Sequence, residues 1–208
     1  MSFLISFEGI DGCGKTTQID MLVDELQSRN IKNSVFREPG DTSISNKLRE
    51  ILLDNNNQIC SESETLLFLA ARSQLVREKI IPSIKKGKIV ICDRYFDSTL
   101  AYQGYGRGLD KSMINNLNLF AINKMFPFLT FILDISPETA YNRIKDNDID
   151  RMESEGIDFL NKISNGYKMI AKSDVNRYKL IKCENKNKFV IHEEIMSIVN
   201  KCIEEKGL

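Results

Sequence analysis

The stretch FEGIDGCGKTTQ, residues 7–18, decides the fold that the rest of the chain must follow. It overlaps the end of the apolar run FLISF, residues 3–7, which is typical of a buried strand. Gly9, Gly12 and Gly14 follow, and glycines let backbone N–H groups turn inward toward an anion. Helical periodicity over 15–29 comes next, so the positive end of a helix would face the same point. The stretch therefore predicts a strand, a phosphate-binding turn and a helix.

The turn has the spacing of a P-loop, since GIDGCGKT at 9–16 reads as glycine, four residues, then Gly-Lys-Thr. Lys15 would reach the β- and γ-phosphates of ATP, and the Thr16 hydroxyl could ligate Mg²⁺. A chance turn is the alternative, but the flanking strand and helix favour a nucleotide site. The residues expected to bind ATP are Gly9, Ile10, Asp11, Gly12, Cys13, Gly14, Lys15, Thr16 and Thr17.

The composition is that of an ordinary globular chain of 208 residues, 42% hydrophobic and 28% charged, and we expect one domain over 1–208. The 29 basic and 29 acidic residues balance, which argues against a protein that coats nucleic acid. No signal peptide and no run of about 20 apolar residues is visible, so we expect no membrane association.

The five cysteines form no CxxC pair, and we interpret them as reduced thiols in a cytoplasmic protein. Cys13 lies in the phosphate-binding turn, where neighbouring amides and Lys15 would favour its thiolate. The alternative is that Cys13 is a small, shielded residue, and the sequence leaves both possibilities open.

Alternating strands and helices predict an α/β fold, a P-loop NTPase with a five-stranded parallel sheet flanked by helices on both faces. The predicted strands are 3–7, 33–38, 88–93, 128–135 and 178–183. The predicted helices are 15–29, 43–53, a long helix from 61 ending near Pro82, 111–124, one opening at Pro137, and 192–205.

Two further segments carry polar side chains at informative places. Asp93-Arg94-Tyr95 follows the third strand, at the sheet edge where ligands of open α/β folds bind. Asp93 could hold Mg²⁺ there and Arg94 could clamp a phosphate of a second substrate. The polar tract KDNDIDRMESEG, 145–156, is either a solvated loop with a helix start or a lid over phosphates.

Together these segments resemble the thymidylate kinase family over essentially the whole chain. The resemblance is carried by FEGIDGCGKTTQ, by REPGDT at 37–42, by LLFLAARSQ at 66–74, by DRYFDSTLAYQGYGRG at 93–108, and by DRMESE at 150–155. It implies transfer of the γ-phosphoryl group of ATP to dTMP with Mg²⁺, for dTTP synthesis, by a homodimer. It also implies the bacterial type, with an arginine in a lid at 143–156. Asp41 stands where the family usually has glycine.

The resemblance also implies roles for single residues. Lys15, Asp11, Arg94 and Arg151 would be catalytic: Asp11 facing the sugar 3′-hydroxyl, Arg94 holding the acceptor phosphate and Arg151 reaching the transferred phosphoryl group. Phe68 would stack on thymine, Arg72 and Gln103 would read its polar edge, and Tyr102 would exclude a ribose 2′-hydroxyl. The metal ligands would be Thr16 and Asp93. The substrate-binding set would be Arg37, Pro39, Arg49, Phe68, Arg72, Arg94, Ser98, Thr99, Tyr102 and Gln103.

Two alternatives remain. The first is a kinase for another deoxynucleotide or a deoxynucleoside, although Arg94 in its implied role requires an acceptor that already carries phosphate. The second is a P-loop regulatory switch that hydrolyses nucleotide to control a partner. The guanine-specifying string NKxD is not present, since NKMF at 123–126 lacks the acid.

Overall fold

The computed structural model describes residues 2–145 and 150–206. Its sheet has five parallel strands in the order β2-β3-β1-β4-β5, which confirms the predicted sheet. Each strand lies within about one residue of its predicted bounds. The strands are β1 Leu4–Glu8, β2 Asn33–Arg37, β3 Ile89–Asp93, β4 Leu129–Asp134 and β5 Tyr178–Lys182.

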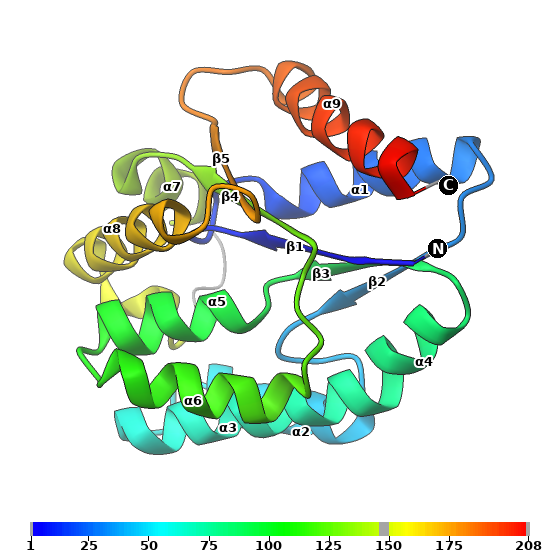
Figure 1. The fold of residues 1–208 in the computed structure, drawn as a ribbon. Helices are drawn as coiled ribbons and strands as arrows, with labels where there is room; N and C mark the ends of the chain where they lie inside the picture. Colours follow the sequence, from blue (N-terminus) through cyan, green and yellow to red (C-terminus); the bar gives the residue numbers. More distant parts are fainter. Residues whose placement is uncertain (1, 146–149, 207–208) are drawn as a thin grey trace.

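Helices lie on both faces of the sheet, with α1 and α9 on one face and α2 to α6 on the other (Figure 1). The helical segments are α1 Lys15–Ser28, α2 Ser43–Leu53, α3 Ser61–Leu75, η1 Val76–Ile80, α4 Ile81–Lys85, α5 Phe96–Thr99, η2 Leu100–Gly106, α6 Lys111–Ile122, α7 Pro137–Ile144, η3 Glu153–Glu155, α8 Ile157–Ser173 and α9 Lys188–Lys206. Among these described helices, none is both long enough and apolar enough to cross a bilayer.

Each face of the sheet contributes side chains to its own hydrophobic core, because successive side chains of a strand point to opposite faces. In β1, Ile5 and Phe7 join the core that includes α1 and α9, whereas Leu4 joins Leu75 and Ile80 on the other face. Burial of both faces explains why these strands are apolar runs without alternation. The carboxyl ends of the strands are thereby held at one edge, where the P-loop and the 93–95 turn meet.

The segment after β3 continues into α5 and η2, a helical stretch that the sequence did not predict. Helix α8 was not predicted either, apart from the helix start that the sequence analysis allowed within the polar tract 145–156. The two segments approach closely, because a Cβ on Gly106 would lie 2.6 Å from the Phe159 ring, and one on Gly166 would lie 2.8 Å from Tyr105. The glycines that argue against a helix by propensity are here required by packing.

Two predicted helix bounds differ from the structure by more than two residues. The long helix was expected to end near Pro82, but it passes through the wide turn η1 and ends at Lys85. Pro82 lies in the first turn of α4, where a missing N–H is tolerated. The last helix begins at Lys188, four residues before its predicted start at 192.

Candidate active site

The phosphate-binding turn depends on glycine at its positive-φ positions. Gly9, Gly12 and Gly14 have φ of 138°, 79° and 98°. At Gly12 a Cβ would lie 2.5 Å from the Ala140 carbonyl oxygen, and at Gly9 it would lie 2.7 Å from that of Leu133. Any larger residue at these two positions would force the backbone apart. The turn therefore keeps its amides in place only with this glycine pattern.

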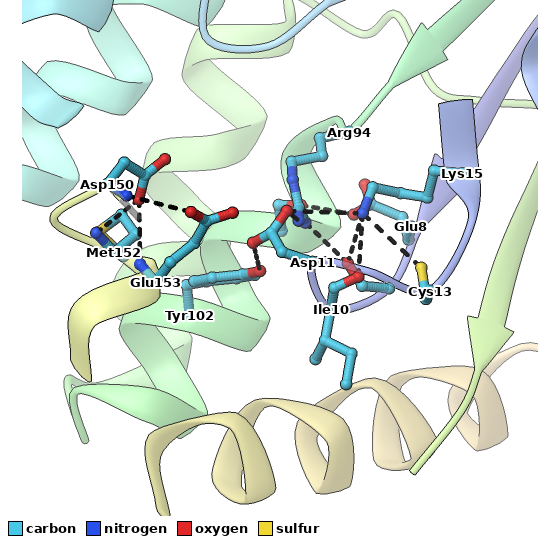
Figure 2. Close-up of polar contacts among 12 residues, drawn as sticks. Glu8, Ile10, Asp11, Cys13, Lys15, Arg94, Tyr102, Asp150, Met152 and Glu153 are labelled. Atoms are coloured by element: carbon cyan, nitrogen blue, oxygen red, sulfur yellow. Dashed lines mark hydrogen bonds and ion pairs between the residues drawn. The ribbon is translucent and has the colours of Figure 1, made fainter. Parts of the chain in front are cut away.

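Lys15 folds back over the turn at the start of α1. Its ammonium donates to the carbonyl oxygens of Gly9 and Ile10, both at 3.1 Å, and lies 3.9 Å from an Asp11 carboxylate oxygen (Figure 2). The charge is thus held within the loop that would surround the phosphates. The cavity in front of it is lined by Asp11, Gly12, Gly14, Lys15, Thr16, Thr17, Arg37, Asp93, Arg94 and Arg143.

Three of the expected ATP-binding residues, Gly9, Ile10 and Cys13, are not among the residues that line this cavity. Gly9 and Ile10 contribute carbonyl oxygens to Lys15, and the Ile10 side chain is buried in the core. Cys13 is 3% exposed and packs in the same core. This burial favours the second interpretation of Cys13, a small and shielded side chain.

A second cavity opens beside the first. It brings together all ten residues of the expected substrate-binding set. Leu53, Met152, Glu38, Asp150 and Asp11 complete the lining. Phe68 and Arg72 both reach it, since residues four apart lie on one face of α3.

Asp11 and Arg94 lie where the two cavities meet, because both residues line both. The Arg94 guanidinium donates to Asp11 at 2.6 Å and to the Gly9 carbonyl oxygen at 2.9 Å, and the Tyr102 hydroxyl donates to Asp11 at 3.0 Å. Burial opposes ionisation of Asp11, but the charges of Arg94 and Lys15 lower its pKa below the usual range. An ionised carboxylate and a fixed guanidinium therefore stand side by side at the junction.

Arg72 forms the polar wall of the second cavity at 2% exposure. It donates to Glu38 at 2.7 Å, to the Thr99 hydroxyl at 2.7 Å and to Asn118 at 2.9 Å. Because Thr99 accepts from Arg72, its own proton remains available to donate. Burial raises the pKa of Glu38, with Arg72 opposing the rise. The arrangement offers oriented donors beside the apolar ring of Phe68.

The lid arginines occupy two different places in the described part of the 143–156 segment; residues 146–149 lie outside it. Arg143 donates to the Gly12 carbonyl oxygen at 3.0 Å and lines the P-loop cavity. Arg151 is not among the described residues that line either cavity. It donates to the Leu52 carbonyl oxygen at 2.7 Å and pairs with Glu64 at 2.7 Å.

The residues expected to ligate Mg²⁺ both line the P-loop cavity: Thr16 with a hydroxyl and Asp93 with a carboxylate. Within residues 2–145 and 150–206 no group of three or more His, Cys, Asp or Glu residues could hold a metal alone. Hard oxygen donors in a small number fit Mg²⁺, which usually takes one or two protein ligands and completes its shell with phosphates and water.

A buried acid of this region, Glu8, carried no role in the sequence analysis. Glu8 ends the apolar strand β1 directly before the turn and is fully buried. Burial, aided by the charge of Asp97, raises the pKa of Glu8 to about 7. The available signal was an acid inside an otherwise apolar strand, since carboxylates are rarely buried without partners.

Known proteins resemble the chain over almost its full length. The family model described as thymidylate kinase matches residues 7–195. A thymidylate kinase of Thermoanaerobacter sp. (strain X514) is 43% identical over 95% of this chain and 97% of its own. That of Kosmotoga olearia is 40% identical over 98% of both chains. The crystal structure of thymidylate kinase from Ehrlichia chaffeensis superposes with a TM-score of 0.78 at 35% identity, covering 96% of this chain and 98% of that one.

Proposed function

The chain belongs to the thymidylate kinase family, and we propose that it transfers the γ-phosphoryl group of ATP to dTMP, giving ADP and dTDP for dTTP synthesis. The observation that carries this proposal is the pair of cavities that share Asp11, Arg37 and Arg94. A donor in one cavity and an acceptor in the other would bring two anions together at the arginines. Phosphoryl transfer asks the protein mainly for such positioning and charge neutralisation.

On the acceptor side, Arg94 would clamp the dTMP phosphate, with Arg37 beside it. Phe68 would stack on thymine, and Arg72, Thr99 and Gln103 would face its polar edge. Pro39, Arg49 and Ser98 would complete the walls of the same pocket. Asp11 would accept a hydrogen bond from the sugar 3′-hydroxyl, and the Tyr102 ring would occupy the space that a 2′-hydroxyl needs.

On the donor side, the turn 9–17 would bind ATP, with Lys15 moving from the loop carbonyls to the β- and γ-phosphates. Thr16 and Asp93, which both line this cavity, would hold Mg²⁺. The ion would supply charge neutralisation at the transferred group. Hydrolysis is limited when the acceptor fills its cavity, because the acceptor oxygen then takes the place of water.

We further propose that residues 1–208 form one kinase domain whose lid is 143–156. For Arg151 to reach the transferred phosphoryl group, it would have to leave Glu64 and the Leu52 carbonyl. Arg143 already faces the P-loop cavity. Comparing the turnover of Arg143→Ala and Arg151→Ala separates the two arginines, and a loss confined to Arg143→Ala would remove the catalytic role of Arg151.

A homodimer is proposed as well, built on the adjacent helices α2, α3 and α6. Their exposed apolar side chains support it, since large apolar patches mark interfaces: Ile44, Ile51, Leu66, Met113, Leu119 and Phe120. Sedimentation of Leu66→Glu should show a monomer. Val175→Glu, which changes an even more exposed apolar residue in the turn after α8, should remain a dimer. A monomeric wild-type protein would contradict the proposal.

We place the enzyme in the cytoplasm, supported by the free thiols of Cys13, Cys60, Cys92 and Cys183.

The kinase function is tested with a panel of acceptors at fixed ATP and Mg²⁺. ADP formation should be fastest with dTMP, slower with dUMP, and close to background with thymidine or with no acceptor. Preference for thymidine would indicate a nucleoside kinase, and ADP formation that needs no acceptor would indicate a regulatory NTPase.

A further inference from the structure

Glu8 is a buried carboxyl group directly beneath the junction of the two cavities. It ends β1, and Phe7 directly before it pairs with Asp93 of β3, which leads into the Arg94 turn. Its side chain has no exposed surface and lines neither cavity, so it does not touch a ligand in either. A charged group is expensive to bury unless its hydrogen bonds are satisfied. The hydrogen-bond donors around this carboxylate therefore indicate its role in the site.

The carboxylate accepts three hydrogen bonds, and one of the donors, Ser98, lines the acceptor cavity. One oxygen accepts from the Tyr95 backbone N–H at 2.7 Å. The other accepts from the Ser98 hydroxyl at 2.6 Å and from the Tyr167 hydroxyl at 2.9 Å. These three donors come from the start of α5, at residues 95–98, and from α8, two segments far apart in sequence.

The direction of these bonds fixes the environment of Arg94. At pH values above its pKa Glu8 is ionised, and because an ionised carboxylate can only accept, Ser98 and Tyr167 must then turn their protons toward Glu8. Their oxygen lone pairs then face the Arg94 guanidinium, one of whose terminal nitrogens lies 3.3 Å from each hydroxyl oxygen. Glu8 thus orients the hydroxyl oxygens of Ser98 and Tyr167 as neutral acceptors for Arg94, and it does not itself form an ion pair with the guanidinium.

The backbone of Arg94 needs support of its own. Its φ of 69° is in the left-handed region, which costs a residue with a Cβ about 1–2 kcal/mol. The Arg94 N–H donates to the Phe7 carbonyl oxygen at 2.9 Å, and the next N–H, that of Tyr95, donates to Glu8. The end of β1 therefore holds the backbone on both sides of the Arg94 Cα, and Glu8 supplies the second of these bonds.

We propose that Glu8 is a positioning residue for the acceptor phosphate: it holds the Arg94 turn and orients the Ser98 and Tyr167 hydroxyls so that the guanidinium is aimed at the junction of the cavities. This inference rests on the proposed dTMP kinase function. Glu8 acts through Arg94, on the acceptor side. Its removal should weaken acceptor binding and leave ATP binding unchanged.

The test is Glu8→Gln, which keeps the size of the side chain and replaces one acceptor oxygen by a donor. At least one of the three donors then loses its acceptor. Steady-state kinetics at pH 8 should show the KM for dTMP raised about tenfold, the size of one lost buried hydrogen bond. The KM for ATP should be unchanged and kcat should stay within about threefold. Tyr167→Phe should change the dTMP KM in the same direction by less.

Asp97→Asn is the matched control, since Asp97 is a second buried carboxyl group in the same turn, at 1% exposure. Its partners are Arg177 and the Tyr178 hydroxyl, and not the two hydroxyls, of Ser98 and Tyr167, that contact Arg94. This variant should melt at a lower temperature than wild type while its dTMP KM stays the same. A merely structural role of Glu8 would make the two variants alike.

Glu8→Gln and Tyr167→Phe should also be less than additive when combined, because they remove the same bond. An unchanged dTMP KM in Glu8→Gln, or equal rises in both KM values, overturns the inference. Where Glu8→Gln does not fold, Tyr167→Phe decides, and an unchanged dTMP KM in that variant overturns it. A wild-type protein that forms no dTDP in this assay would contradict the kinase function itself, a result distinct from either of these.

Discussion

The guanidinium of Arg94 and the carboxylate of Asp11 form a 2.6 Å ion pair at the point where the two cavities join. The pair places one positive and one negative group at the junction, each partly buried. A phosphate arriving from the acceptor side would meet Arg94, and a sugar hydroxyl would meet Asp11. The pair therefore places opposite charges at fixed positions before any ligand binds, and it explains how one ion pair could serve both substrates.

Lys15→Ala should abolish most of the turnover, by about 10²-fold or more, because it removes the point charge that bridges the β- and γ-phosphates. The variant should fold, since Lys15 contacts loop carbonyls and lines the donor cavity. Lys168→Ala is the control, because Lys168 also pairs with an aspartate, Asp134, but outside both cavities. Near-normal turnover of Lys15→Ala, measured by coupled ADP assay, would refute the donor site.

Tyr102→Ala should narrow the gap in kcat/KM between dTMP and its ribo-analogue, because it removes the ring that would exclude a 2′-hydroxyl. Tyr102→Phe keeps the ring and loses only the hydrogen bond to Asp11. The Phe variant should therefore retain the selectivity and change only the rate. If both variants keep the wild-type ratio, selection against ribose lies elsewhere in the pocket.

Asp41→Ala should lower the free energy of unfolding by about 1–2 kcal/mol. Alanine would have to adopt a left-handed backbone conformation, and the hydrogen bond of the Asp41 side chain would be lost. Asp41 has φ of 65°, and its carboxylate accepts from the Arg37 N–H. Asp41→Asn should stay within about 0.5 kcal/mol of wild type, because asparagine tolerates this conformation and keeps an acceptor oxygen. Urea titrations decide it, and equal losses in the two variants would show that neither feature matters.

The titration of Glu8 should contribute to the pH dependence of the free energy of unfolding. Burial and the nearby Asp97 raise its pKa from 4.5 to about 7, while Ser98 and Arg94 oppose the rise. Between these values the folded state binds more protons than the unfolded state, so the contribution of Glu8 to stability is lost as the pH rises toward 7. Glu8→Gln should flatten this slope between pH 5 and 8. A slope identical to wild type in unfolding measurements would show that Glu8 titrates normally.

The sheet could be predicted from the sequence because its signals are local: each strand is an apolar run. The residues expected to bind substrate came from the family resemblance, which rests on short motifs, and the structure gathers them around the second cavity. The placement of Arg151 was not predictable in this way. Its partner, Glu64, reads in sequence as an acid in the first turn of α3, and only the fold brings the two together.

The role of Glu8 was hidden for the same reason. Its partners Ser98 and Tyr167 are 90 and 159 residues away along the chain. Helices η2 and α8 escaped prediction because Gly104, Gly106 and Gly166 argue against helix locally, whereas their close packing requires small residues. Tertiary contacts overrode local propensity in these segments.

The most direct test of the central claim is the product ratio when the protein is incubated with ATP, Mg²⁺ and dTMP, followed by ion-exchange chromatography. A dTMP kinase forms dTDP and ADP in equal amounts, with no excess of inorganic phosphate, and forms little ADP when dTMP is omitted. Equal ADP formation with and without dTMP, accompanied by inorganic phosphate and no dTDP, would contradict the assignment of the second cavity as an acceptor site.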